Sequence, residues 1–234
     1  MSQVIKEKPE TKSSKNLMVT PILKETMEHH SAGNWYLAKQ SCKKALAIDP
    51  SNDVANLVLG QLAFRAGEND YAVELLNRSL KTNPEQAKTY LILGKIYATL
   101  NARQKAVSAF QTAIKLNSNF AEAFQELGCL YFKEGATDLA ISALRNIKFA
   151  PGFESGFFAL ASALNQKKEY QDALYCIHFA IRLQPQQKSY LALFSKLASY
   201  YNGCEAETTR RGFSETCSLF LTADNVDYQS LSKI

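Results

Sequence analysis

Cysteine and histidine, the residues best suited to nucleophilic, redox or metal chemistry, are few and scattered in this sequence. The cysteines are Cys42, Cys129, Cys176, Cys204 and Cys217, and the histidines are His29, His30 and His178. No two cysteines have a CxxC spacing, their number is odd, and no histidine belongs to a metal-binding motif. The sequence therefore predicts neither a disulfide framework nor a metal site, and it favours a reducing, cytoplasmic environment.

No catalytic motif is present either. The sequence has no glycine-rich phosphate loop, no GxSxG and no HExxH. Glu122, Glu126 and Glu134 have the spacing of a solvated helix face rather than of paired catalytic acids. Cys129 allows two interpretations, a reactive thiol or a small apolar surface residue. We therefore expect a chain that is not an enzyme and needs no cofactor.

Composition excludes further classes of protein. Hydrophobic residues make up 46% of the chain, yet no apolar run approaches the roughly 20 residues of a membrane-spanning helix. The net charge is +5, and part of it lies in residues 1–17, which are predicted to be a disordered basic tail without a secretory signal. The remaining charge is too small to predict a nucleic-acid surface.

The elements that carry these residues follow a repeat of 34 positions. Ala38, Ala72, Ala106 and Ala140 are each 34 apart, and Ala173 follows after 33. Two further columns keep the same period. One contains Gly60, Gly94, Gly128, Ala161 and Ser195, and the other contains Pro50, Pro84, Ser118, Pro151 and Pro185. A period of this length indicates an array of stacked units, so it decides the fold class.

Each unit has the pattern of two amphipathic helices joined by a short turn. In the third unit, Tyr90, Leu93 and Tyr97 share one helix face. Glycines recur at the turn, at Gly33, Gly67 and Gly135, where they can adopt a left-handed conformation. The small residues of the glycine and alanine columns predict close approach of the two helices, with bulky neighbours filling the space beside them.

The chain resembles the tetratricopeptide-repeat family, because bulky-x-x-Leu-Gly-x-x-Tyr occurs at Tyr90…Tyr97 and at Phe124…Tyr131. This resemblance implies an all-α, right-handed superhelical solenoid of helix-turn-helix hairpins with a C-terminal capping helix. We expect an array over residues 18–201 and a cap with a possible linker over 202–234. The units are 19–52, 53–86, 87–120, 121–153 and 154–187, followed by a further helix.

Some units depart from the pattern. The first has Glu25 and Thr26 where others have Leu-Gly, so its first helix is expected to be frayed or atypical. The fourth is one residue short near Ile147–Pro151. After residue 187 the helix around Phe194 is expected to be followed by an apolar stripe that covers the last repeat. This stripe contains Phe213, Cys217, Phe220 and Leu221.

The resemblance also implies a ligand-binding groove on the outward side of the first helices. The matching positions are Leu57, Gln61, Arg65, Lys88, Leu91, Lys95, Gln125, Cys129, Lys133, Phe158 and Ser162. They combine apolar and neutral polar side chains with scattered cations, which suits an extended or helical peptide of acidic character. We therefore predict a protein or peptide partner, no nucleic acid and no membrane, and a monomer or weak homodimer.

Alternatives remain at this point. The Lys–Asn, Asn, Lys–Arg carboxylate clamp of co-chaperone members of the family is absent here, because Leu57, Gln61 and Ile92 are among the residues at its positions. A second hypothesis is a substrate-recruiting module of a methyl-, sulfo- or glycosyltransferase, since residues 227–234 have the pattern of a helix that begins and stops without a cap. A third, RNA binding, is supported only by the positive charge.

Overall fold

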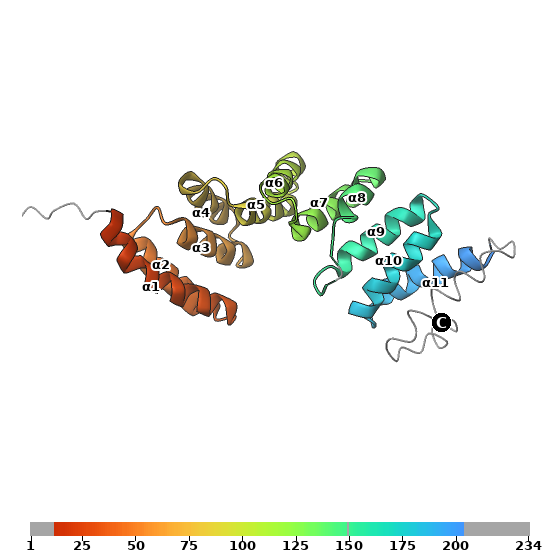
Figure 1. Ribbon diagram of the computed structural model, residues 1–234, viewed down its shortest axis with the longest axis horizontal. Helices are drawn as coiled ribbons and strands as arrows, with labels where there is room; N and C mark the ends of the chain where they lie inside the picture. Colours follow the sequence, from red (N-terminus) through yellow and green to blue (C-terminus); the bar gives the residue numbers. More distant parts are fainter. Residues whose placement is uncertain (1–11, 149, 204–234) are drawn as a thin grey trace, which may run out of the picture. The chain divides into compact units, whose positions relative to one another are not determined.

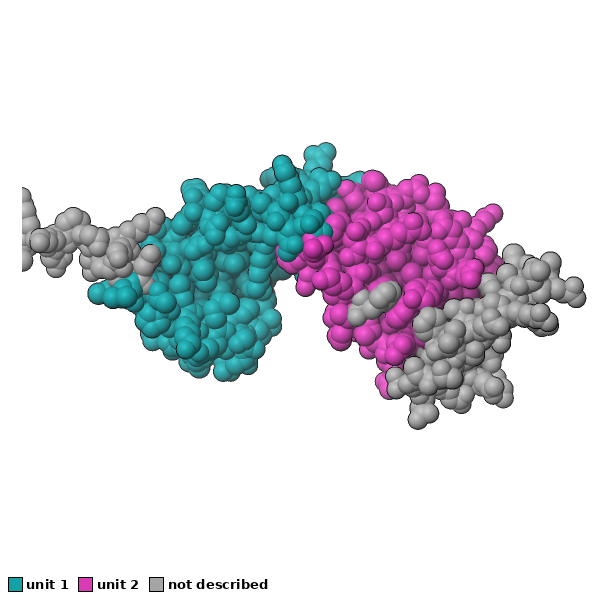
Figure 2. All heavy atoms as spheres, in the orientation of Figure 1, with its two compact units in different colours: residues 1–118 teal, residues 119–234 magenta. Residues whose placement is uncertain are grey.

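The computed structural model describes residues 12–148 and 150–203, which form eleven helices and no strand (Figure 1). The helices are α1 (Lys12–Ser31), α2 (Trp35–Ile48), α3 (Asp53–Arg65), α4 (Asn69–Thr82), α5 (Ala87–Thr99), α6 (Arg103–Leu116), α7 (Ala121–Lys133), α8 (Thr137–Leu144), α9 (Glu154–Gln166), α10 (Tyr170–Leu183) and α11 (Lys188–Gly203). The predicted all-α fold is confirmed. The chain divides into two compact units, residues 1–118 with α1–α6 and residues 119–234 with α7–α11 (Figure 2).

The turns inside the hairpins share one backbone conformation. Gly33, Gly67 and Gly135 have φ values of 74°, 81° and 74°, as predicted from the glycine column. Asn101 and Lys168 stand at the same repeat position, with φ values of 56° and 63°. Glycine reaches this left-handed region without steric cost, and asparagine does so more readily than other residues. A fixed turn geometry therefore persists even where the sequence does not supply glycine.

The helices of a hairpin approach most closely at the glycine column. A Cβ built on Gly60 would lie 3.0 Å from Leu76 Cγ, whereas one on Gly94 would overlap the ring of Phe110. Gly128 faces Leu144 in the same way. Phe110 and Leu144 are fully buried, so they have no free space into which to move. Each glycine thus fits one large side chain of the second helix, as the sequence predicted.

The first hairpin reaches the same packing with different residues. Thr26 replaces the glycine and is fully buried, with its hydroxyl donating to the Ile22 carbonyl oxygen at 2.8 Å. Cys42 stands where the other hairpins have leucine, phenylalanine or isoleucine, and it is also fully buried. A larger residue on α1 is therefore matched by a smaller one on α2. This exchange explains why Glu25-Thr26 does not weaken the helix.

Helix α1 differs from the expectation of a frayed first helix. It runs without interruption over 20 residues, with Pro21 inside it, and it begins at Lys12, within the segment predicted to be disordered. Residues 1–11 lie outside the described part of the chain, as do residues 204–234 with the predicted apolar stripe at Phe213–Leu221 and the tail at 227–234. Helix α11 packs against α10 and α9.

The residue missing from the fourth repeat changes the second unit. Helix α8 has 8 residues, whereas α2, α4, α6 and α10 each have 14. The chain then passes through Gly152, with φ of 96°, before α9 begins. Helix α9 packs against α7 as well as α8, as α3 packs against α1 and α5 in the first unit. A Cβ on Gly156 would lie 2.8 Å from Gln125 Oε1, so α9 and α7 meet closely there.

Candidate functional site

The predicted groove residues belong to two separate sets, one in each compact unit. Leu57, Gln61, Arg65, Lys88, Leu91 and Lys95 lie in the first unit, whereas Gln125, Cys129, Lys133, Phe158 and Ser162 lie in the second. We describe the surroundings of each set within its own unit, because local contacts decide which side chains can reach a ligand.

In the first unit, the apolar members of the set serve mainly in packing. Leu91 is only 7% exposed, and Leu57 packs against the core cluster around Leu59 and Leu62. By contrast Arg65, in the last turn of α3, and Lys88, in the first turn of α5, are exposed. The free surface of the predicted set is therefore cationic, with apolar side chains beneath it.

Arg65 is held in place by an aromatic side chain of the neighbouring hairpin. Its Cζ lies 3.8 Å from the centre of the Trp35 ring, the first residue of α2. The face of an indole attracts a guanidinium and leaves the N–H groups at its edge able to donate hydrogen bonds. Among the described residues, no carboxylate forms an ion pair with Arg65. Its position is thus fixed while its charge is not neutralised.

Two buried polar atoms lie beside this stacked pair. His30, in the last turn of α1, packs its ring edge-on against Trp35, with 5.4 Å between ring centres. His30 Nε2 and Gln61 Oε1 are both buried, and neither forms a short, well-aligned hydrogen bond with a described residue. Such groups are uncommon in folded proteins, because a buried polar atom without a partner loses the hydrogen bonds that it made to water.

The charge environment keeps His30 neutral. Burial lowers its pKa most, and the positive charges of Lys88 and Arg65 lower it further, while a weak hydrogen bond with the Gln61 side chain acts in the opposite direction. The charges of Arg65 on α3 and Lys88 on α5 therefore act on His30 of α1. The set of His30, Trp35, Gln61, Arg65 and Lys88 is called the Trp35 cluster below.

In the second unit, two predicted residues are engaged by the unit itself. Gln125 is 9% exposed, and its Nε2 donates to the Gly152 carbonyl oxygen at 3.2 Å. Cys129 Sγ lies 4.0 Å from the Ser155 carbonyl oxygen. Burial, together with the charge of Glu126, raises the pKa of the Cys129 thiol to about 11. The thiol is therefore protonated at neutral pH, which favours the apolar surface role over the reactive one.

The remaining residues of the second set differ in exposure. Phe158 is half-buried against Tyr190 of α11, with 5.0 Å between ring centres. Ser162 Oγ donates to the Phe158 carbonyl oxygen at 2.8 Å, a bond within one helix turn. Lys133 is exposed. Most of this set thus packs within its own unit, and Lys133 is its exposed cation.

Sequence comparison gives the same family as the repeat columns. A family model described as tetratricopeptide repeat matches residues 29–96, and a second model with the same description matches residues 87–120. Residues 29–120 of this chain are therefore repeats of the tetratricopeptide-repeat family. No curated protein matches the chain in a sequence search.

Solved structures of tetratricopeptide-repeat proteins resemble the model. The crystal structure of MamA protein is 28% identical, with a TM-score of 0.56 over 74% of this chain and 94% of that one. PilF of Pseudomonas aeruginosa is 19% identical, with a TM-score of 0.71 over 94% and 98%. YrrB, described as a TPR protein with an unusual peptide-binding site, is 23% identical, with a TM-score of 0.57 over 74% and 90%. The last two likenesses show the fold alone.

Sequence reasoning missed Trp35 and His30. Both lie in the first repeat, at the end of α1 and the start of α2, outside the groove positions that the family resemblance implies. One signal was present, since Trp35 is the only tryptophan of the chain and directly follows the Gly33 turn. Only the packing of α1 against both α2 and α3 shows that these residues meet Gln61 and Arg65.

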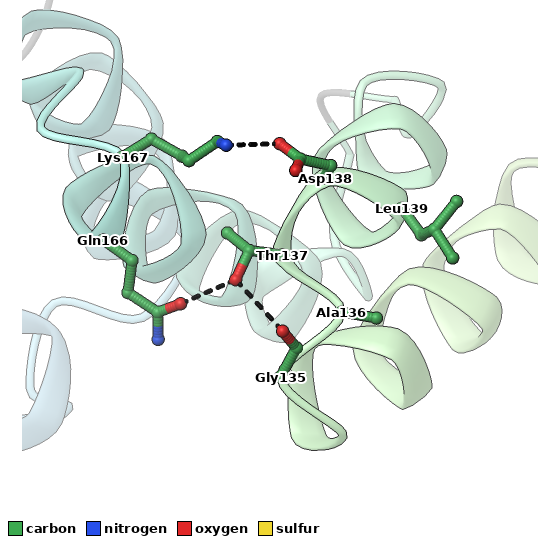
Figure 3. Close-up of a pocket in the computed structure, with 7 residues that line it drawn as sticks. All are labelled: Gly135, Ala136, Thr137, Asp138, Leu139, Gln166 and Lys167. Atoms are coloured by element: carbon green, nitrogen blue, oxygen red, sulfur yellow. Dashed lines mark hydrogen bonds and ion pairs between the residues drawn. The ribbon is translucent and has the colours of Figure 1, made fainter.

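Two hollows of this repeat protein lie away from the Trp35 cluster. One, of about 500 Å³, lies in the second unit beside the turn before α8 and the end of α9 (Figure 3). Its polar groups bind one another: Thr137 Oγ1 bonds Gln166 Oε1 at 2.8 Å, and Lys167 Nζ lies 2.7 Å from Asp138 (Figure 3). The other, of about 510 Å³, is formed by α4, α5 and α6 with Tyr90 and Tyr97.

Two classes of site receive no support from the described residues. None of the helices formed by residues 12–148 and 150–203 combines the length and the apolar character that a membrane span requires. Within the same ranges, no three histidine, cysteine or acidic side chains are grouped so that they could hold a metal ion.

Proposed function

We propose that this tetratricopeptide-repeat protein is an interaction scaffold that binds an extended or helical peptide segment of a partner protein on the first helices of its repeats. The observation that carries the proposal is the exposed cationic surface of the first unit, where Arg65 is stacked on Trp35, Lys88 is exposed and Leu57 is half-buried. Apolar side chains supply contact area, and fixed cations select the acidic groups of the peptide.

The distribution of charge supports the first unit as the main binding surface. Residues 12–118 contain fourteen Lys and Arg against eight Asp and Glu, whereas residues 119–203 contain eight against seven. Like-signed charge on one unit attracts an acidic partner and speeds its association. Related scaffolds share this fold, YrrB among them, and the proposal extends peptide binding to this chain. It assigns no catalytic step to the chain.

The test uses selected peptides because the partner is not identified. A displayed library of random twelve-residue peptides is selected on the purified chain, and the peptides obtained are synthesised and titrated by calorimetry. We expect the double variant Arg65→Glu, Lys88→Glu to weaken binding by about tenfold or more, since two charge-assisted contacts are lost. The matched control is Lys43→Glu, Lys44→Glu, which makes the same charge change at exposed positions of α2.

Three results can be told apart. Weaker binding in the first variant but not in the control supports the proposal. Equal loss in both variants would show that net charge alone attracts the peptide. Full binding by a folded Arg65→Glu, Lys88→Glu protein would place the peptide elsewhere, with the hollow formed by α4, α5 and α6 as the next surface to test.

A further inference from the structure

We infer that the Trp35 cluster is a binding site for a single carboxylate, the side chain of a glutamate or aspartate in the bound peptide, and that His30 takes up a proton when the carboxylate binds. The inference rests on the proposed peptide-binding function and names the group that the first unit recognises. It goes beyond a general preference for acidic peptides, because it assigns that preference to a defined set of residues from four helices.

The first argument is the fixed position of Arg65. A flexible arginine loses conformational freedom when it binds an anion, whereas one already stacked on Trp35 at 3.8 Å loses less. Stacking uses the face of the guanidinium and leaves its edge, which carries the N–H groups that pair with a carboxylate in two parallel bonds. Trp35 itself is 38% exposed, so the cluster opens to solvent.

The second argument is a pair of buried polar atoms: His30 Nε2 and Gln61 Oε1 form no short hydrogen bond in the described part of the chain. His30 interacts with the neutral Gln61 side chain in the free protein. An anion is a stronger acceptor than an amide, so a protonated His30 donates to a bound carboxylate from one side while Arg65 donates from the other. The bound group thereby gives His30 a charged acceptor in place of the Gln61 amide.

The third argument is the sign of the charges that face His30. Helix α3 presents Arg65 and α5 presents Lys88, both cationic, while α2 presents the neutral Trp35 ring. Burial and these cations lower the pKa of His30, so the imidazole is neutral at pH 7.5 in the free protein. A carboxylate placed among the same groups offsets their positive charge and raises the pKa of His30 again. Binding and protonation are then linked, and acidification strengthens binding as long as the carboxylate itself stays ionised.

The experiment observes Trp35 directly, because it is the sole tryptophan of the chain. The full chain is titrated with N-acetylglutamate whose α-carboxyl group is converted to an N-methylamide, so that only the side-chain carboxylate is charged. The matched probe is the corresponding glutamine compound. We expect a saturable change in Trp35 emission with the glutamate compound only, and an affinity that rises up to about tenfold between pH 8 and pH 5.5.

Variants separate the site from the net charge of the protein. Arg65→Gln should weaken binding of the glutamate compound by about tenfold or more. The control Arg78→Gln makes the same change at an exposed arginine of α4 that pairs with Glu74, and it should leave the affinity unchanged. His30→Gln keeps a neutral donor but cannot be protonated, so binding should persist and lose its dependence on pH.

Each outcome bears on the inference. An equal response to the glutamine compound, or unchanged binding by a folded Arg65→Gln protein, would overturn it. Binding of inorganic phosphate in preference to the glutamate compound would overturn the assignment to carboxylates. If selected peptides bind without any requirement for an acidic residue, the inference fails while the proposed scaffold function stands. If the glutamate compound binds and no peptide can be selected, the carboxylate site stands and the peptide-binding function fails.

Discussion

The two compact units share one hairpin framework but use the outward face of their first helices differently. At one repeat position the first unit has Leu57 and Leu91, and the second has Gln125, which bonds the Gly152 carbonyl oxygen. At another, Gln61 in the first unit has a buried oxygen without a described partner, whereas Cys129 lies against Ser155. Gln125 Oε1 is buried without a described partner as well, but the amide nitrogen of Gln125 bonds another segment of its own unit.

This difference lies beside the short fourth repeat. Helix α8 ends after 8 residues, and the chain then passes through Gly152 before α9. Gln125 of α7 bonds this loop, whereas Leu91, at the same repeat position of α5, is buried by apolar packing. The position is buried in both units, but a polar side chain fills it beside the altered loop. Residues at the same position of different repeats therefore do not form equivalent sites, even where the helices are preserved.

The largest expected effect is the loss of stability when a glycine at the close contact between paired helices is enlarged, and it tests a contact that both units share. Gly94→Leu should lower the free energy of unfolding by about 3 kcal/mol or more, because the added side chain overlaps the fully buried Phe110 ring. Gly128→Leu in the second unit should give a loss of the same order through Leu144. Urea denaturation followed by circular dichroism measures both changes.

The control for these variants is Ser108→Leu, which adds a similar side chain at an exposed position of α6. Its unfolding free energy should stay within about 0.5 kcal/mol of the wild type. An unchanged melting temperature for Gly94→Leu or Gly128→Leu would refute the close contact between paired helices.

The second prediction tests how the units differ, by one substitution made in each. Gln125→Leu should destabilise the protein by about 1–3 kcal/mol, since the Gly152 carbonyl oxygen loses its partner. Gln61→Leu should cost less. Both glutamines have a buried Oε1 without a partner in the described structure, so the expected difference comes from the bond that Gln125 Nε2 donates to Gly152. The two variants are compared in the same urea titration. Equal effects would show that the second unit does not depend on its glutamine more than the first.

The smallest expected effect is on how the stability of the protein depends on pH. Burial lowers the pKa of His178 in the second unit below its ordinary 6.5, and the charge of Arg182 lowers it further. The unfolded chain therefore binds a proton at a higher pH than the folded one, so stability is complete above pH 6.5 and falls as the pH drops through the folded pKa. His178→Phe should reduce this loss between pH 7 and pH 5. A melting temperature with the same pH dependence in both proteins would show that His178 does not contribute to it.

Much of the framework was predictable because it depends on local rules. The period of 34 residues reflects a hairpin whose contacts between small and large residues recur in every repeat. The left-handed turns at Gly33, Gly67 and Gly135 follow from the conformational freedom of glycine. The first helix was expected to be frayed or atypical, and it is atypical rather than frayed: α1 is continuous over 20 residues, against 13 in α3, and Cys42 compensates for Thr26 across the hairpin. That exchange depends on a contact between two helices, which a comparison of single columns does not show.

The candidate site was only partly accessible to the same reasoning. The family resemblance gave Gln61, Arg65 and Lys88 as groove residues, because the groove side of a first helix follows from its periodicity. It also gave Leu91 and Gln125, which are buried in the structure, and it did not include Trp35 and His30. Burial at these positions depends on how neighbouring helices pack, which residue spacing within one helix does not show.

The sequence by itself therefore determined the family, the hairpins, their turns and the lack of known catalytic motifs, since each depends on residue type and spacing along the chain. Only the tertiary structure decided which groove positions remain exposed and where Arg65 is held. The reason is physical. Arg65 lies over Trp35, with His30 at the ring edge, only when α1, α2 and α3 pack together, and residue spacing within one helix does not determine that packing.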